Sequence, residues 1–266
     1  MNWLKVISFT SLALLVIPVA VLLYEGFGPL SSSEGYSVEV FRSIALTLIS
    51  SGIAALVCAV LFTPLSYYFA RNRTKVAQTL ADIPATIPHP IVGVALLVLS
   101  SPLTPFGRFL ISIGLNLFNT VLGLVVALVV VSAPIYIKAM QPFFESMNQS
   151  NENFAYGLGA SKLRAFSLVV IPNSGRGILS ASLIAMSRAM SEFGSIAILA
   201  YYVLQQPFYG VSSVSVLIFN LYTYSGLAAA VTASAVTILV SFVLLFALRF
   251  IESGPKKLFI SKRQTS

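Results

Sequence analysis

Long apolar runs separated by short polar stretches dominate the hydropathy pattern of this chain. Each run has about the 20 residues that a helix needs to cross roughly 30 Å of hydrocarbon. A packed soluble core explains one or two such runs, but hardly six. The pattern therefore predicts an all-α membrane protein with six transmembrane helices, at about residues 6–24, 43–69, 83–101, 118–140, 178–200 and 226–250.

The longest polar interval between apolar runs is residues 150–177, with the sequence SNENFAYGLGASKLRAFSLVVIPNSGRG. Its first half has apolar residues at helical spacing, Phe154, Leu158 and Ala165. Pro172 follows a short apolar run and is not expected to continue a helix. A short amphipathic helix between two spans suits docking into a groove on a soluble partner. On composition alone, an ordinary solvated loop explains the interval equally well.

Composition supports the membrane prediction, since 57% of the residues are hydrophobic, 9% are charged and the mean hydropathy is +0.92. The net charge of +8 is unevenly distributed over the predicted spans. With the amino terminus inside, Arg42 and Arg108 lie outside and Arg188 lies within a span. The remaining basic residues fall on the cytoplasmic side or its edge: Lys5, Arg71, Arg73, Lys75, Lys138, Lys162, Arg164, Arg176, Arg249, Lys256, Lys257, Lys262 and Arg263.

This asymmetry follows the positive-inside rule, so both termini are expected to be cytoplasmic. The positive charge then reflects topology, and nucleic acid is not an expected partner.

Three prolines, Pro84, Pro88 and Pro90, interrupt the pattern where the third span is expected to begin. Irregular backbone at membrane depth is tolerated only when it is buried in protein or lines a water-filled cavity. Pro88 and His89 are therefore candidates for lining a translocation path, although a tight loop explains the prolines equally well. His89 is the only histidine, and without a cluster of His, Cys or carboxylate residues no metal site is expected.

The fifth predicted span contains two ionisable residues, Arg188 and Glu192. They are four positions apart and can pair on one face of a helix. Charged groups inside a membrane segment usually face the bundle interior and pair with one another, which favours a structural ion pair. The alternative is that Arg188 lines the path and attracts an anion. Ser191, between the two, is a further candidate for lining the path.

Catalytic motifs are missing from the sequence. The stretch 157–162 resembles a phosphate-binding loop only superficially, because its glycine spacing is wrong and no strand precedes it. No nucleophile elbow or paired catalytic carboxylates occur either. The chain is therefore not expected to be an enzyme, to bind a cofactor or to hydrolyse ATP itself.

Residues 153–172 resemble the cytoplasmic coupling loop of ABC-importer permeases, in which Glu-Ala-Ala is followed by Gly and then by Ile-x-Leu-Pro. Gly159 and Pro172 have the spacing of that pattern. Asn153 occupies the position of the glutamate, and Glu152 lies one position earlier. The resemblance implies a role in ATPase coupling for Glu152, Asn153, Phe154, Ala155, Gly159, Ala160, Ser161, Lys162, Arg164 and Pro172.

Over nearly its whole length the chain resembles the permease of molybdate/tungstate ABC importers, the tungstate branch most closely. The stretches that carry this resemblance are 82–89, 93–96, 158–161, 187–194, 199–202, 216–219 and 224–227. The resemblance implies a type I importer permease whose single transmembrane domain covers residues 1–266, with the coupling loop at 150–177.

The expected location is the prokaryotic plasma membrane. The expected partners are a second copy of the chain, an ABC ATP-binding subunit that carries ATP and Mg²⁺, and an external oxyanion-binding protein. A permease for sulfate or another anion is the alternative within this class. An ion-coupled secondary transporter is the alternative from another class, although the chain has no clear internal repeats.

Overall fold

The computed structural model describes residues 2–72 and 74–252, with side chains for residues 3–72 and 74–247. The α-helices are α1 (Asn2–Phe27), α2 (Val38–Arg71), α3 (Lys75–Thr86), α4 (His89–Leu99), α5 (Pro105–Ser112), α6 (Val121–Ser146), α7 (Ser150–Gly157), α8 (Lys162–Ala165), α9 (Ile171–Asn173), α10 (Gly175–Met190), α11 (Ile196–Leu199), α12 (Val214–Asn220) and α13 (Leu227–Glu252). A 3-10 turn, η1 (Ser33–Tyr36), precedes α2, and π-helical turns η2 (Phe166–Val170) and η3 (Leu221–Ser225) follow α8 and α12. Among the described residues, strand-like pairing is confined to one bridge between Val203 and Val211. The all-α prediction is confirmed.

In the part of the chain that the structure describes, four helices, α1, α2, α6 and α13, are long and apolar enough to cross a membrane alone. They match the predicted spans 6–24, 43–69, 118–140 and 226–250, although α6 begins only at Val121 and α13 at Leu227. Two further spans become complete only if two helical segments that meet at a bend are counted together. The fold therefore departs from six straight helices at two places.

The first bend separates α3 from α4 by 103°. Ile87 is extended (φ −90°, ψ 152°), because the ring of Pro88 disfavours a helical conformation in the preceding residue. Pro90 then lies in the first turn of α4, where a missing N–H costs nothing. The predicted span 83–101 thus covers the end of α3 and all of α4, and the break lies at the prolines, where the sequence predicts irregular backbone.

The second bend, of 74°, lies between residues 162–173 and α10. Helical turns run through α8, η2 and α9, and Pro172 lies in the first turn of α9. The expectation that Pro172 ends the helix is therefore wrong, since a π-helical turn directly precedes it. The predicted span 178–200 is also wrong as a continuous helix, because α10 ends at Met190 and residues 191–195 are not helical.

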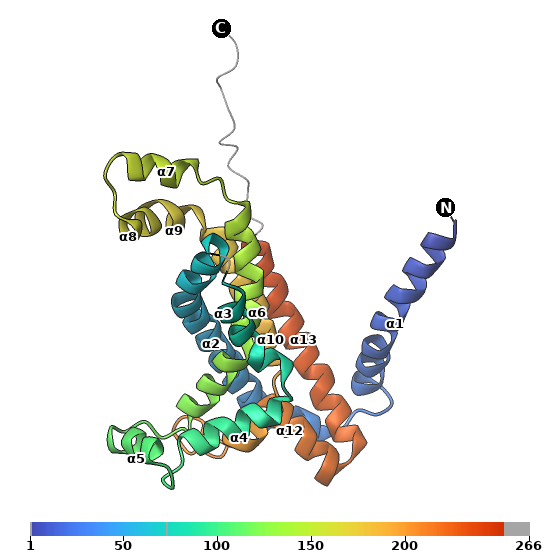
Figure 1. The fold of residues 1–266 in the computed structure, drawn as a ribbon. Helices are drawn as coiled ribbons and strands as arrows, with labels where there is room; N and C mark the ends of the chain where they lie inside the picture. Colours follow the sequence, from blue (N-terminus) through green and yellow to red (C-terminus); the bar gives the residue numbers. More distant parts are fainter. Residues whose placement is uncertain (1, 73, 253–266) are drawn as a thin grey trace.

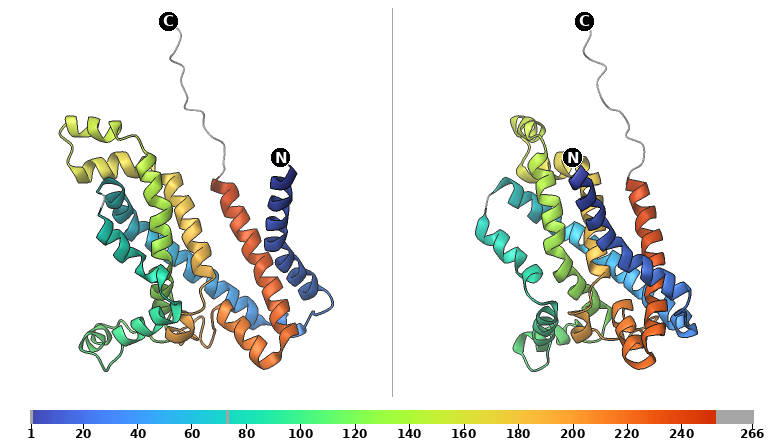
Figure 2. Two further views of the ribbon diagram at one scale, coloured as in Figure 1. Left: turned by 45° about the vertical axis from the view of Figure 1, so that its right-hand side comes forward. Right: turned by 90° about the vertical axis from the view of Figure 1, so that its right-hand side faces the viewer.

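Helices α2, α6 and α10 pack together as the centre of the fold (Figure 1). Fully buried small residues occur on all three helices, including Ala54, Cys58, Ala127 and Ala185. Small side chains let helix backbones approach closely in a membrane, where packing replaces the hydrophobic effect between helices. By contrast, α1 stands apart from this centre and lies along α13 (Figure 2).

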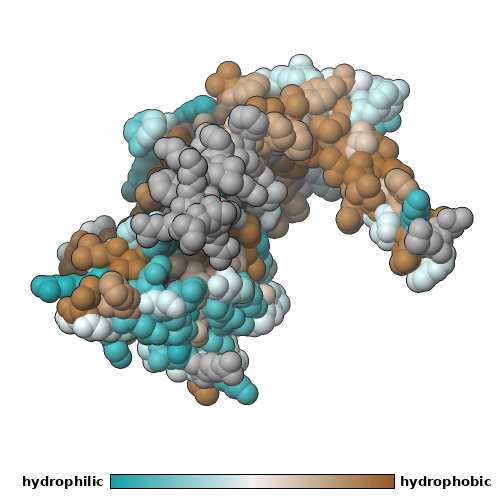
Figure 3. Space-filling model, turned by 90° about the horizontal axis from the view of Figure 1, so that it is seen from above, coloured by the Kyte–Doolittle hydropathy of each residue, from teal (hydrophilic) through white to brown (hydrophobic). Residues whose placement is uncertain are grey.

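The segment α7–α9 projects from the same end of the molecule as the start of α1 and the end of α13, whereas α4, α5 and α12 lie at the opposite end (Figure 1). We call these the coupling end and the far end. Seen from the coupling end, hydrophilic residues gather on the α7–α9 side, while the side that carries α1 is mostly hydrophobic (Figure 3).

The basic residues of α8 and of the α2–α3 junction lie at the coupling end, and Arg108 of α5 lies at the far end. Several residues used to predict the topology lie outside the described residues or have no described side chain: Arg73, Arg249, Lys256, Lys257, Lys262 and Arg263. The cytoplasmic location of both termini therefore stays a prediction.

Candidate functional site

The first candidate site is the coupling segment, which we define as residues 150–173. Its first helix, α7, ends at Gly157, and the chain then reverses at a left-handed glycine, Gly159 (φ +84°). The Ala160 N–H donates to the Ala155 carbonyl at 3.0 Å, and the Gly159 N–H donates to the Tyr156 carbonyl at 2.9 Å. This is the glycine-based helix ending in which free carbonyls are satisfied by the reversing chain. Glycine is required here because other residues are strained at this φ.

The second helix of the coupling segment begins at Ser161, whose Oγ accepts a hydrogen bond from the Arg164 N–H at 3.3 Å. A serine at this position satisfies a backbone donor that the first helical turn leaves free. Lys162 and Arg164 are exposed, as is Pro172. Gly159 and Ser161 together turn the chain back on itself between α7 and α8.

Large apolar side chains of the coupling segment point away from the rest of the chain. Phe154 is 71% exposed and Leu158 is 75% exposed, and Leu163 and Leu168 are exposed to a similar extent. Contiguous exposed apolar residues beside basic residues are typical of a protein interface. The chemistry suits a partner with an apolar groove and carboxylates at its rim.

Two neighbouring polar residues of α7 face in opposite directions. Asn153 is exposed. Glu152 is only 5% exposed, and its Oε1 lies 2.6 Å from Arg71 Nη2. Its Oε2 accepts a hydrogen bond of 2.5 Å from the Tyr67 hydroxyl. Glu152 is among the residues that the sequence assigns to ATPase coupling, but its carboxylate contacts Arg71 and Tyr67 of its own chain.

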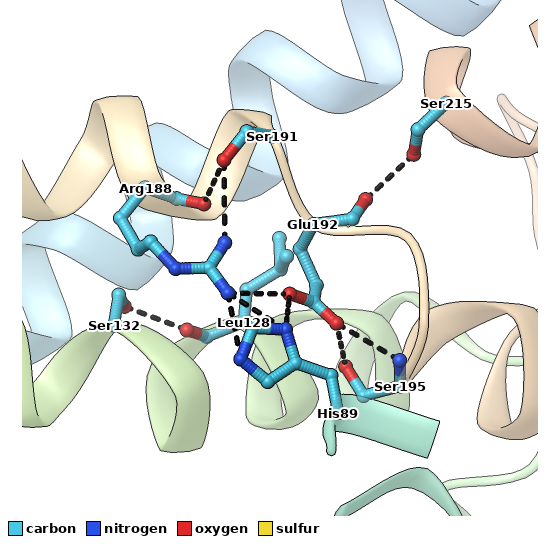
Figure 4. Close-up of polar contacts among 8 residues, drawn as sticks. All are labelled: His89, Leu128, Ser132, Arg188, Ser191, Glu192, Ser195 and Ser215. Carbon is cyan, nitrogen blue, oxygen red and sulfur yellow. Dashed lines mark hydrogen bonds and ion pairs between the residues drawn. The ribbon is translucent and has the colours of Figure 1, made fainter. Parts of the chain in front are cut away.

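The second candidate site is an intramembrane cluster where α4 begins and α10 ends (Figure 4). Glu192 Oε2 lies 3.0 Å from Arg188 Nη2 and 2.8 Å from His89 Nδ1. Glu192 Oε1 accepts hydrogen bonds from the backbone N–H and the hydroxyl of Ser195, at 2.9 and 2.8 Å. Both carboxylate oxygens therefore have partners, as a charge that is only 1% exposed requires.

His89 bridges the two charged residues of this cluster. Arg188 Nη2 lies 2.7 Å from His89 Nδ1 and 2.9 Å from His89 Nε2, and Glu192 Oε2 lies 2.8 Å from His89 Nδ1. His89 thus links the start of α4 to the end of α10.

Hydroxyl groups hold the non-helical stretch that follows α10. Ser191 Oγ donates to the Arg188 carbonyl at 2.9 Å and accepts from Arg188 Nη1 at 3.2 Å. Ser215 Oγ donates to the Glu192 carbonyl at 2.6 Å, which ties this stretch to α12 (Figure 4). On α6, Ser132 Oγ donates to the Leu128 carbonyl within its own helix.

Two glycines allow α4 to approach residues 191–195 closely. A Cβ at Gly93 would lie 2.6 Å from the Ser195 carbonyl oxygen, and a Cβ at Gly194 would lie 2.8 Å from Pro90 Cδ. The cluster therefore depends on backbone contact as well as on charge. Pro88, at the start of α4, sets the direction from which His89 enters.

A pocket of about 230 Å³ lies between α2, α10, α12 and α13, and Ser191 is among its lining residues. Three of its hydroxyl groups already donate to carbonyls of their own helices, from Thr47, Ser187 and Thr237. They have no second proton to offer an anion. The pocket therefore presents mainly alkyl surface.

The structure separates the predicted site residues into two groups. Arg188, Glu192, His89 and Ser191 come together in the intramembrane cluster, and the predicted coupling residues lie in or beside the coupling segment. Sequence reasoning missed the partners of the two glutamate carboxylates, Tyr67, Arg71 and Ser195, and the bond from Ser215 to the Glu192 backbone carbonyl. Among the described residues, no three His, Cys, Asp or Glu side chains are placed to hold a metal ion.

Comparison with known proteins identifies a family and several relatives. The family described as binding-protein-dependent transport system inner membrane component matches residues 53–257. The molybdate/tungstate permease WtpB of Thermococcus kodakarensis is 31% identical over 199 residues, 72% of this chain and 74% of that protein. The sulfate permease CysT of Synechocystis is 27% identical over 265 residues, 96% of this chain and 90% of that protein.

Two solved transporters have a similar fold. A bacterial ABC transporter that imports alginate has a chain with a TM-score of 0.65 and 19% identity, and the match covers 94% of both chains. The MetNI methionine ABC transporter has a chain with a TM-score of 0.54 and 18% identity, covering 80% of this chain and 90% of that chain.

The Gly93→Ala substitution is expected to destabilise the protein by about 1–3 kcal/mol, because the added methyl group overlaps the Ser195 carbonyl. The matched control is Gly52→Ala in α2, where a Cβ meets nothing within 4 Å and alanine favours the helix. The stabilities of the two purified variants are compared by thermal unfolding in detergent. Equal stability of both variants would contradict the close crossing.

The Arg188→Ala substitution is expected to lower the yield of folded protein, because it leaves the buried Glu192 carboxylate without its cation. Breaking a buried ion pair in this way costs about 3–5 kcal/mol. Arg188→Ala combined with Glu192→Gln should recover much of the yield, since the unpaired charge is then gone. Size-exclusion chromatography measures both; a well-folded single variant that has lost anion uptake would instead assign Arg188 to the cargo.

Proposed function

This chain belongs to the family of binding-protein-dependent transport system inner membrane components, and from that premise we propose that it is the permease subunit of an importer for a tetrahedral oxyanion. Family membership makes it a multi-pass protein of the cell membrane and the membrane-spanning component of an ABC importer. The cargo, the partners and the role of each site are the proposed parts.

The observation that carries the coupling role is the exposed coupling segment. It presents Phe154 and Leu158 together with Lys162 and Arg164, and nothing else in the described chain covers them. An ABC ATP-binding subunit is the proposed partner: its groove receives the apolar side chains, and its carboxylates pair with the basic ones. Asn153 faces the same partner. ATP and Mg²⁺ bind to that subunit, and this chain binds no cofactor.

The proposed mechanism is a rigid-body switch between two states. Closure of two ATP-binding subunits draws together the coupling segments of two permease copies. The movement enters at residues 153–163 and passes to the core of α2, α6 and α10, which opens the path toward the outside. Hydrolysis of ATP and release of the products return the path to its inward-facing state.

The coupling end is accordingly assigned to the cytoplasm, together with both termini. Its basic residues support this orientation by the positive-inside rule. The far end then faces an external oxyanion-binding protein, which delivers the cargo. In this assignment the cluster of Arg188, Glu192 and His89 holds the two broken helices together, and Pro88 and Ser191 lie beside the path.

Tungstate or molybdate is the proposed cargo, with sulfate as the alternative. Relatives of both kinds resemble the chain, and all three ions are tetrahedral dianions. An ion-coupled secondary transporter is the competing class. Such a transporter works without an ATP-binding subunit, so it would not account for the exposed coupling segment.

The Phe154→Asp substitution is expected to weaken binding of the ATP-binding subunit about thirtyfold, which corresponds to the roughly 2 kcal/mol of an interface anchor. The fold should be unaffected, because the side chain is exposed. The matched control is Leu103→Asp, an exposed leucine at the far end. Affinity is measured with the purified subunits in detergent, and unchanged binding by the Phe154 variant would remove the docking assignment.

Cargo is tested by ATPase stimulation in proteoliposomes that contain the complete importer. Binding protein loaded with tungstate or molybdate is expected to stimulate ATP hydrolysis more than sulfate-loaded protein at equal occupancy. The empty binding protein is the control. Stronger stimulation by sulfate would reassign the cargo and leave the importer class intact.

A further inference from the structure

We propose that Glu152 is a positioning residue, which fixes the coupling segment to the transmembrane core of its own chain through Arg71. The inference rests on the proposed function, because it concerns how movement of the coupling segment reaches the membrane helices. It assigns this carboxylate a role inside the permease instead of a contact with the ATP-binding subunit.

Arg71, the last residue of α2, joins three helices. Its Nη2 lies 2.6 Å from Glu152 Oε1 on α7, and its Nη1 donates to the Phe144 carbonyl near the end of α6 at 2.8 Å. Two different nitrogens of one rigid guanidinium therefore hold α7 and α6 against α2. No other ion pair among the described residues involves the coupling segment.

Tyr67 extends the same junction to the second half of the coupling segment. Its hydroxyl donates to Glu152 Oε2 at 2.5 Å. Its ring centroid lies 4.9 Å from that of Phe166 in η2 and 5.5 Å from that of Phe144. The Arg71 guanidinium carbon lies 5.3 Å from the centre of the Tyr67 ring. One carboxylate thus organises contacts to α2, α6, α7 and η2.

Burial makes this carboxylate unsuited to docking. Glu152 has both oxygens engaged and is almost fully buried, and the Arg71 side chain is 13% exposed. A charge in this position is stable only while its partner remains, so α7 and α2 are held together electrostatically. The covalent link from α6 to α7 is short and non-helical, residues 147–149. Without the ion pair, α7 can pivot on this link, and its movement is no longer transmitted to α2.

The test is the number of oxyanions imported per ATP hydrolysed by the complete importer in proteoliposomes. Glu152→Gln and Arg71→Gln are each expected to lower this ratio about tenfold, within the range of typical coupling energies. The double variant should have a ratio no lower than that of the more impaired single variant, because the two substitutions remove the same interaction. The control is Glu145→Gln, an exposed carboxylate near the end of α6, which should keep the wild-type ratio.

Each other outcome has a defined meaning. A low ratio for Glu152→Gln with a normal ratio for Arg71→Gln would overturn the proposal, because Glu152 would then act on the ATP-binding subunit. Multiplied losses in the double variant, or normal ratios throughout, would overturn it as well. If the single variants do not assemble, the exchange Arg71→Glu with Glu152→Arg should restore assembly, and no restoration counts against the pair.

Failure of the proposed function is visible separately. In that case the wild-type chain binds no ATP-binding subunit and shows no ATP-driven uptake, before any variant is compared. A wild-type importer that couples normally, with variants that also couple normally, leaves the proposed function in place and removes only the role of Glu152.

Discussion

A charge removed from water must be neutralised nearby, and this constraint determines how the coupling segment and the broken helices are held to the rest of the fold. Among the described side chains, two carboxylates are almost fully buried, Glu152 and Glu192, and each is paired with an arginine. One pair lies where α2 and α6 meet the coupling segment, and the other lies where α4 meets the end of α10. The first pair holds α7 to α2, and the second holds the start of α4 to the end of α10 and the non-helical stretch that follows it.

The two clusters divide the chain into parts with different tasks. The core of α2, α6 and α10 lies between them and is packed through alanine and other small residues. The coupling segment exposes an apolar and basic surface beyond the first cluster. Around the second cluster the backbone is broken, and Gly93 allows α4 to lie against it. In the proposed importer, movement generated at one end must pass through this core to reach the broken helices.

Much of the fold follows from the sequence, because apolar runs of membrane length have few alternatives to helices in a bilayer. The helices α2, α6 and α13 lie where uninterrupted apolar runs predict spans, with small differences at their starts. The bends were harder to predict. Pro88 signals the first, but Pro172 lies inside continuous helical turns, and nothing in the apolar run 178–200 shows that α10 ends at Met190.

The site residues were predictable where they are local. Arg188 and Glu192 are four positions apart, and the structure places them in contact although Glu192 lies beyond the helix end. Partners that are distant in sequence were not predictable, since Arg71 and Glu152 are 81 residues apart. Their pairing depends on how α2 and α7 pack, which one sequence does not reveal. The glutamate pattern of the coupling loop likewise does not show that Glu152 turns inward.

The most direct test of the central claim is to express this chain with an ABC ATP-binding subunit and an oxyanion-binding protein of the same organism and to purify it by an affinity tag. The account predicts that the ATP-binding subunit co-purifies and that loaded binding protein stimulates its ATP hydrolysis. A chain that purifies without the subunit and takes up anions on an ion gradient alone would contradict it.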